Sequence, residues 1–263
     1  MQAAFFDLDK TVIARASMVA FGPSFQRAGL LSRWLVARAL YAQLVYLYLG
    51  ADAARMARLR TAVLRVIVGW EQAHVTEIVE ETLETVIEPI VYSEALELMR
   101  SHQAAGRKVF IISASPEEIV APLARFLGAD ESIATRARLD DDGRYTGEVE
   151  FYAYGSGKVD AMERVARRDG IDLEASWAYS DSVTDEPMLR AVGHPVAVNP
   201  DRDLARVAKA EDWEIRRFDR PVPLDASTRR TTPTKVGVAV GTAVVLGGAV
   251  AGGVALGRKK SPR

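Results

Sequence analysis

Carboxylate side chains occur in two clusters, and each cluster directly follows an apolar run. Asp7 and Asp9 come after the apolar residues 3–6, and a second cluster begins at Asp181. An apolar run that ends in polar residues is typical of a buried strand in an α/β sheet, where sites form at the carboxyl ends of the strands. Because side chains two residues apart on an extended chain point the same way, Asp7 and Asp9 can face one reacting group. One carboxylate could then attack as a nucleophile while the other moves a proton.

Two acidic clusters that meet at one sheet edge would repel each other unless a cation lay between them. Asp181 and Asp185 form the second cluster, and hard carboxylate oxygens of this kind suit magnesium. The chain has no cysteine, and its three histidines lack the spacing of metal ligands. Two simpler interpretations remain open: Asp7 and Asp9 belong to a solvated loop, or Asp185 caps a helix that begins near Glu186.

A serine and a lysine between the two clusters have the chemistry that binds phosphate. Ser113 ends the apolar run 108–112, and Lys158 follows the glycine-containing residues 155–157. A hydroxyl and an ammonium both donate hydrogen bonds to phosphate oxygens. Taken separately, each is equally compatible with a turn serine or a solvated lysine. Their position between the two acidic clusters is what makes them candidates.

The elements that must position these residues alternate between strand and helix. The chain has 263 residues, of which 49% are hydrophobic, enough for one domain of ordinary size and a smaller one. Apolar residues recur every three or four positions over residues 17–88, which predicts several packed helices. Further on, the pattern predicts helix 93–105, strand 108–112, helix 116–127, a hairpin over 134–154, helix 158–168, strand 177–179, helix 186–191 and strand 195–198. This alternation predicts a parallel sheet with helices on both faces.

The order of these signals resembles that of the haloacid dehalogenase superfamily. The matching motifs are Asp7, Asp9 and Thr11, then Ser113, then Lys158, then Asp181 and Asp185. The resemblance extends over residues 1–215 and implies an α/β fold with a Rossmann-like parallel sheet. The core would comprise residues 1–13 and 89–215. A helical C1-type cap, residues 14–88, would follow the first strand, as in the subgroup that includes phosphoserine phosphatases.

The resemblance also implies an activity, namely hydrolysis of a phosphate monoester by a magnesium-dependent phosphatase. Asp7 would be the nucleophile that forms an aspartyl-phosphate, and Asp9 would be the acid and base. Thr11, Ser113 and Lys158 would bind the phosphate, and Mg²⁺ would be held by Asp7, the backbone carbonyl of Asp9 and Asp181, with Asp185 nearby. A phosphotransferase or mutase of the same superfamily and an inactive membrane-tethered scaffold are the alternatives.

The substrate implied by the resemblance would be a phosphate monoester of a small molecule or a lipid. Phosphoserine phosphatases that resemble this chain have a glutamate for the substrate amine where this chain has Ala16, and Thr184 stands where they usually have asparagine. Phosphoserine is therefore predicted to be a poor substrate, unless a cap glutamate such as Glu71, Glu77 or Glu80 takes over. Apolar residues near the first motif would favour an uncharged or aliphatic leaving group; they are Val12, Ile13, Met18, Val19 and Phe21.

The C-terminal region differs in composition from the rest of the chain. Residues 216–235 are rich in proline, arginine and threonine and predict a linker. Residues 236–256 carry no charge, are long enough for a transmembrane helix, and contain glycines four apart that would allow a helix–helix dimer; a disordered tail is the alternative. Residues 257–263 are a basic tail.

The charge distribution favours a membrane location and argues against nucleic acid. Residues 216–263 carry a net charge of +8, and the body before them carries −9. No signal peptide is visible, because the first apolar run is short and ends at Asp7. We therefore expect a single-pass protein of the cell membrane with its catalytic domain in the cytoplasm.

Overall fold

The computed structural model describes residues 1–31 and 66–220. The chain divides into two units, Met1–Leu224 and Asp225–Arg263, and the fold below is that of the first unit. The predicted membrane segment 236–256 lies outside the described residues, as do residues 32–65 of the predicted cap. Within the described ranges, no helix is both long and apolar enough to cross a membrane.

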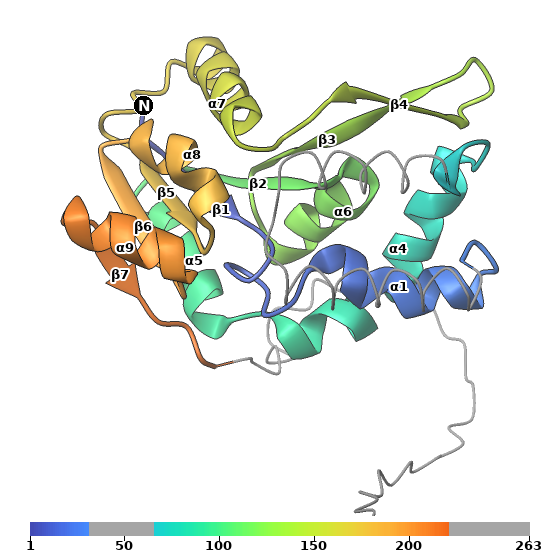
Figure 1. Cartoon of the computed structure of the whole chain (residues 1–263), viewed down its shortest axis with the longest axis horizontal. Coiled ribbons are helices and arrows are strands. Elements are labelled where there is room, and N and C mark those ends of the chain that lie inside the picture. The colour runs from blue at the N-terminus through green and yellow to red at the C-terminus, as the bar shows by residue number, and fades with distance from the viewer. Residues whose placement is uncertain (32–65, 221–263) are drawn as a thin grey trace, which may run out of the picture. The chain divides into compact units, whose positions relative to one another are not determined.

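A seven-stranded sheet in the order β4-β3-β2-β1-β5-β6-β7 forms the centre of this unit (Figure 1). The strands are β1 Ala3–Asp7, β2 Lys108–Pro116, β3 Glu131–Leu139, β4 Tyr145–Phe151, β5 Trp177–Ser180, β6 His194–Val198 and β7 Glu214–Arg216. Only β3 and β4 pair antiparallel, and the other neighbours are parallel. The predicted α/β class with a mostly parallel sheet is confirmed.

Strand β1 occupies the middle of the sheet and is buried on both faces. All five of its residues are buried, as expected for a parallel strand covered on both sides. Phe6 stacks on Tyr179 with ring centroids 4.3 Å apart, and Phe5 stacks on Phe110 at 4.9 Å. Because alternate residues point to opposite faces, Phe5 and Phe6 belong to two different apolar clusters.

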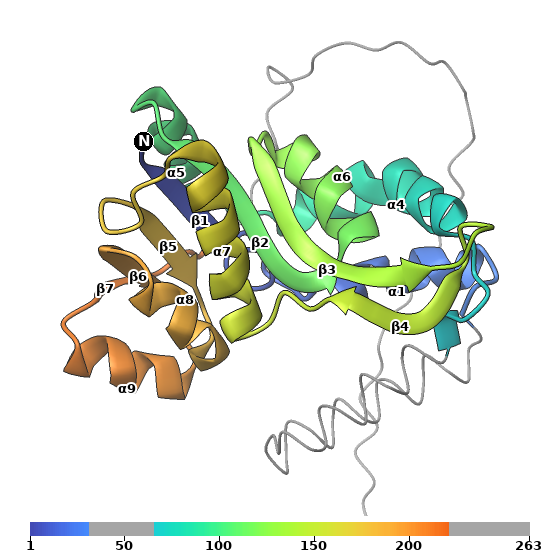
Figure 2. The ribbon, with the colours of Figure 1, turned by 90° about the horizontal axis from the view of Figure 1, so that it is seen from above.

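Helices cover the two faces of the sheet (Figure 2). The α-helices are α1 Ser17–Arg27, α4 Gln72–Ile87, α5 Ser93–Ala104, α6 Glu117–Leu127, α7 Ser156–Asp169, α8 Glu186–Arg190 and α9 Arg202–Ala210, with short 3-10 turns at Glu88–Ile90 and Val183–Asp185. Helices α5 and α6 contribute to the cluster that contains Phe6, and α7, α8 and α9 to the cluster that contains Phe5. The sheet is thus enclosed between two helical layers.

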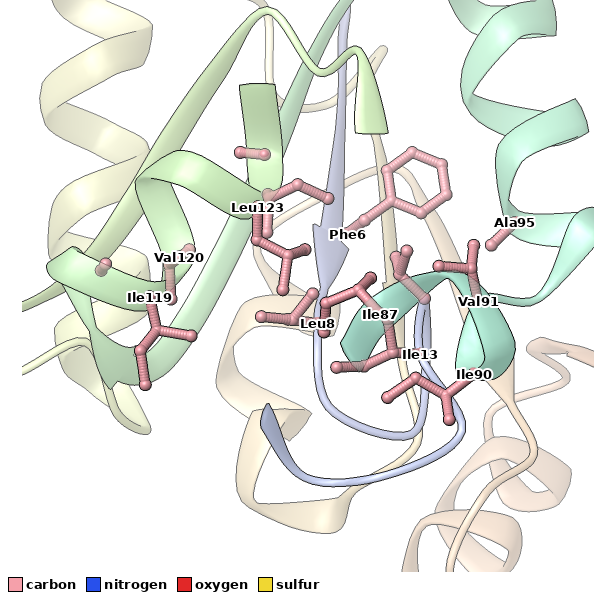
Figure 3. Close-up of a cluster of buried hydrophobic side chains, with 14 of the residues drawn as sticks. Phe6, Leu8, Ile13, Ile87, Ile90, Val91, Ala95, Ile119, Val120 and Leu123 are labelled. Carbon is pink, nitrogen blue, oxygen red and sulfur yellow. The ribbon is translucent and has the colours of Figure 1, made fainter. Parts of the chain in front are cut away.

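The described part of the insert between β1 and β2 continues the first apolar cluster. Ile87 and Ile90, just before α5, belong to the same buried cluster as Phe6 and Leu8 (Figure 3). Helix α4 contacts both α1 and α6. The chain just before α4 is also joined to the β3–β4 hairpin, because the backbone N–H groups of residues 69 and 72 donate to carbonyls of residues 145 and 143 at 2.9 and 3.0 Å.

Residues 216–220, which were predicted to begin the linker, pack against the domain. Arg216 ends β7, and Phe218 is only 6% exposed. The backbone of Phe218 exchanges two hydrogen bonds with the Asn199 side chain, at 2.9 and 3.0 Å. Ser93 donates its backbone N–H to the Arg220 carbonyl at 3.0 Å. The arginines and prolines around Phe218 suggested a linker, but one buried aromatic side chain fixes the segment.

Replacing Phe218 with alanine is expected to destabilise the domain by about 3 kcal/mol, because a buried phenyl ring is lost and a cavity remains. The change is measured as the free energy of unfolding in urea. Phe126→Ala is the matched control, because Phe126 is 37% exposed. Equal stability losses in the two variants would contradict the assignment of residues 216–220 to the folded domain.

Candidate active site

The predicted site residues meet at the carboxyl ends of three adjacent strands. Asp7 pairs in register with Ile112 of β2, so Ser113 follows one residue beyond it. On the other side Phe6 pairs with Tyr179 of β5, which brings Ser180 and then Asp181 to the same edge. The two acidic clusters and the serine, far apart in the sequence, are therefore brought together by the sheet.

Lys158 is the cation at the centre of this edge. Its Nζ donates to Oδ1 of Asp7 at 2.6 Å and to Oδ2 of Asp185 at 2.7 Å. The Lys158 side chain is only 2% exposed, and both carboxylates are buried. The hydroxyl of Ser180 donates to the same Oδ2 of Asp185 at 2.7 Å. Asp185 is thus held by the lysine, and its side chain makes no capping hydrogen bond to helix α8.

The chain conformation before α7 explains why glycines precede Lys158. Gly155 has φ of +54°, a backbone region that favours glycine. A Cβ on Gly157 would lie 2.2 Å from the carbonyl oxygen of Tyr152, which is too close for any other residue without a backbone shift. These glycines let α7 begin close to the strand ends, so that Lys158, in its first turn, reaches Asp7.

Asp9 is bound by different groups from Asp7. Its Oδ1 accepts the backbone N–H of Ser17 at 2.7 Å, and its Oδ2 accepts the hydroxyl of Ser115 at 3.1 Å. A tight turn carries the chain from Asp7 to this position: the N–H groups of residues 12 and 13 donate to the carbonyl of Leu8 at 3.0 and 3.1 Å, and Lys10 has φ of +65°. The two carboxylates of the first motif therefore have separate surroundings.

Two hydroxyl groups complete the predicted phosphate-binding set with Lys158. Ser113 is 1% exposed and its Oγ accepts the backbone N–H of Ser115 at 3.1 Å. Thr11 is fully buried, and its Oγ1 has no hydrogen-bond partner among the described residues. A buried hydroxyl without a partner costs free energy, so a bound oxygen anion would satisfy it.

Burial and neighbouring charges shift the pKa values of the groups at this edge. Burial raises the pKa of Asp7 well above its ordinary value, Lys158 opposes the shift, and Asp185, Asp181 and Asp9 add to it. Burial also raises the pKa of Asp181 to about 7, with Lys10 opposing. Burial alone would lower the pKa of Lys158, but Asp7 and Asp185 raise it above its usual range. Asp7 and Asp185 share one buried ammonium, and Asp181 and Asp9 add further carboxylates near Asp7, so the carboxylates outnumber the buried cation.

The charge excess and the oxygen donors fit a hard divalent cation. In the described ranges, no three acidic or histidine side chains are gathered closely enough to hold a metal alone. Lys158 contacts one oxygen of Asp7 and one of Asp185, whereas Ser17 and Ser115 engage both oxygens of Asp9. Asp7, Asp181 and Asp185 are therefore the carboxylates with an oxygen left for the ion. Magnesium commonly uses one or two carboxylates and completes its shell with water and phosphate oxygens, so this donor set suits it.

Four further residues hold the site together and were not identified from the sequence. They are Ser17, Ser115, Ser180 and Asp201. Asp201 accepts the backbone N–H of Val183 at 3.0 Å and donates its own N–H to the Asp181 carbonyl at 2.7 Å, which fixes the fourth motif. The adjacency of Ser180 to Asp181 was a usable signal, whereas nothing in the sequence pattern indicates Asp201.

The parallel sheet and the contact between Asp7, at the end of the central strand, and Lys158 are features of one class of hydrolase. The chain belongs to the haloacid dehalogenase-like hydrolase family, whose model matches residues 4–190. A probable phosphatase from Mycobacterium tuberculosis is 47% identical over 252 residues, which cover 96% of this chain and 87% of that protein. A second protein of that organism, named phosphoserine phosphatase, is 36% identical over 220 residues, 82% of this chain and 70% of that protein.

A solved structure supports the same fold. The crystal structure of a protein of unknown function from Bordetella pertussis has a TM-score of 0.71 and is 30% identical, covering 82% of this chain and 97% of that chain. The predicted family and the predicted enzyme class, a phosphoric monoester hydrolase, are confirmed by these comparisons.

Proposed function

We propose that this chain is a magnesium-dependent phosphatase that hydrolyses a phosphate monoester through an aspartyl-phosphate on Asp7. The observation that carries the proposal is the contact of Lys158 with Asp7 at 2.6 Å, at the sheet edge that Ser113 also reaches by its register with β1. A buried ammonium that can neutralise a phosphate thus lies against the carboxylate at the end of the central strand. Such a carboxylate can attack phosphorus, because the anion that approaches it meets positive charge and hydrogen-bond donors.

The residues divide the reaction between them. Asp7 forms a bond to phosphorus through a carboxylate oxygen while the bond from phosphorus to the leaving oxygen breaks. Asp9 gives its proton to that leaving alkoxide and then takes a proton from the water that hydrolyses the aspartyl-phosphate. Lys158, Ser113 and Thr11 bind the non-bridging phosphate oxygens. Asp7, Asp181 and the backbone carbonyl of Asp9 would hold Mg²⁺, which would supply positive charge for phosphoryl transfer when bound.

Asp7→Asn is expected to lower the turnover number by roughly a thousandfold or more, because the amide keeps the shape of the side chain but cannot attack phosphorus. Hydrolysis of para-nitrophenyl phosphate measures the effect. Asp160→Asn is the matched control, since it makes the same substitution at an exposed residue of α7. If Asp7→Asn keeps a rate within about tenfold of the parent, the nucleophile is another residue.

Asp181→Asn is expected to raise the magnesium concentration needed for half-maximal rate by roughly tenfold or more, because one of two carboxylate ligands is lost. A second readout is independent of activity: added Mg²⁺ should raise the melting temperature of the parent more than that of the variant. Identical magnesium dependence of parent and variant in both measurements would remove Asp181 from the metal site.

We also propose that the substrate lacks a buried ammonium group. Ala16 offers no carboxylate, and the cap glutamates that could replace one are engaged elsewhere: Glu71 pairs with Arg144, Glu77 contacts His74, and Glu80 pairs with Arg125. Of the apolar residues expected to line the pocket, Val12, Ile13 and Phe21 are instead fully buried in the core. Met18 and Val19 remain exposed, at 40% and 45%, on helix α1.

Phosphoserine is therefore expected to be a poorer substrate than glycerol phosphate. Its ammonium would lose water without gaining a carboxylate partner, which costs roughly several kcal/mol of binding free energy. Specificity constants for the two compounds, measured side by side, test this. A value for phosphoserine equal to or above that for glycerol phosphate would show that another residue recognises the amine.

We propose further that residues 14–88 act as the cap and that residues 236–256 anchor the enzyme in the cell membrane, with the catalytic domain in the cytoplasm. The uncharged length of the second segment and its basic flanks support the anchor, and its glycine spacing would allow a dimer. Recovery of the full-length protein entirely in the soluble fraction of lysed cells would contradict the anchor.

A further inference from the structure

The carboxylate of Asp9 belongs to a closed ring of hydrogen bonds with two serines. Oδ1 accepts the N–H of Ser17 at 2.7 Å, and Oδ2 accepts the hydroxyl of Ser115 at 3.1 Å. The hydroxyl of Ser17 in turn donates to the hydroxyl of Ser115 at 2.9 Å. Ser17 is fully buried and Ser115 is 7% exposed. Both oxygens of the carboxylate are therefore fixed, which specifies its rotation as well as its position.

The two serines come from different parts of the fold. Ser17 is the first residue of α1, the helix that begins the insert after β1, and Ser115 lies in β2, two residues beyond Ser113. The partial positive charge of a helix N-terminus favours a carboxylate at this position. Asp9 is thus oriented jointly by the insert and by the strand that carries Ser113.

We propose that Ser17 and Ser115 are positioning residues that hold Asp9 in the orientation needed to protonate the leaving group. This inference rests on the proposed function, in which Asp9 is the acid. A proton donor must lie within hydrogen-bond reach of the leaving oxygen, and a carboxylate free to rotate spends only part of its time there. The helix α1 thereby becomes part of the catalytic geometry through one backbone N–H.

The chain permits a selective deletion of that backbone donor. Ser17 occupies the first helical position, where proline is well tolerated. The preceding residue, Ala16, has φ of −64° and ψ of 127°, the extended conformation that a following proline requires. Ser17→Pro therefore removes the N–H and the hydroxyl and puts a ring carbon where the amide hydrogen met Asp9, so that the carboxylate must move, whereas Ser17→Ala removes the hydroxyl alone. Ser115→Ala removes the other donor to Asp9.

Two aryl phosphates of similar size separate proton donation from other defects. Para-nitrophenolate leaves readily without a proton, whereas the more basic phenolate of phenyl phosphate needs one. The specificity constant kcat/KM reports the steps up to loss of the leaving group, so the later attack of water on the aspartyl-phosphate does not contribute. A defect confined to the fold or to phosphate binding lowers both constants equally.

We expect Ser17→Pro and Ser115→Ala to lower kcat/KM by roughly tenfold or more for phenyl phosphate and by less than about threefold for para-nitrophenyl phosphate. Ser17→Ala should have a smaller selective effect than Ser17→Pro, and Asp9→Asn should show the largest. Ser101→Ala, on the exposed face of α5, is the matched control.

The possible failures can be told apart. Equal losses on both aryl phosphates in Ser115→Ala and Ser17→Pro, or no loss on either, would overturn the positioning role. If Ser17→Pro does not fold, Ser115→Ala decides the question alone. If the parent hydrolyses neither compound with magnesium present, the proposed phosphatase function fails, and the inference fails with it.

Discussion

The site depends on one buried ammonium placed between two carboxylates. Lys158 contacts Asp7 of β1 and Asp185 of the segment after β5, so a single side chain joins three elements of the fold. Removing a charge from water is costly, and a buried ion pair that loses one partner destabilises a protein by about 3–5 kcal/mol. Lys158, Asp7 and Asp185 therefore constrain one another. The same constraint keeps an anionic nucleophile beside a cation in a region with little solvent.

The packing of the sheet holds the carboxyl ends of β2, β1 and β5 next to Lys158. β1 lies between β2 and β5, and stacked rings on both sides of it, Phe5 on Phe110 and Phe6 on Tyr179, resist sliding of the strands. A shift of one residue in register would move Asp7 away from Lys158 and would also expose buried rings. The chemistry at the sheet edge is therefore specified by apolar packing several residues away.

The sequence predicted the parts of the fold that depend on local pattern. The alternation of apolar runs and helical periods was sufficient for the order of elements from β1 to β6, and the polar residues at the strand ends located Asp7, Ser113 and Asp181. Individual hydrogen bonds between distant residues were not predictable, although the meeting of the two acidic clusters at one sheet edge was. Ser17 and Ser115 meet at Asp9 only because the insert folds back on β2, and Asp201 reaches the fourth motif from the start of α9. α9, β7 and the packing of Phe218 were missed because each depends on few apolar side chains, such as Leu204 and Ala208 in α9 and Phe218 beyond β7.

The hydrogen bonds between the chain before α4 and the β3–β4 hairpin have a consequence for how this protein can vary. Residues 69–72 are held by residues 143–145, and the other end of the insert is held at Ser17 by Asp9. The stretch between these two anchored points closes a loop whose ends are fixed by the surrounding fold, and the entropy of closing such a loop grows only slowly with its length. Insertions or deletions between Leu31 and Val66 are therefore expected to leave both anchored points, and with them the hydrogen bonds at Asp9, in place.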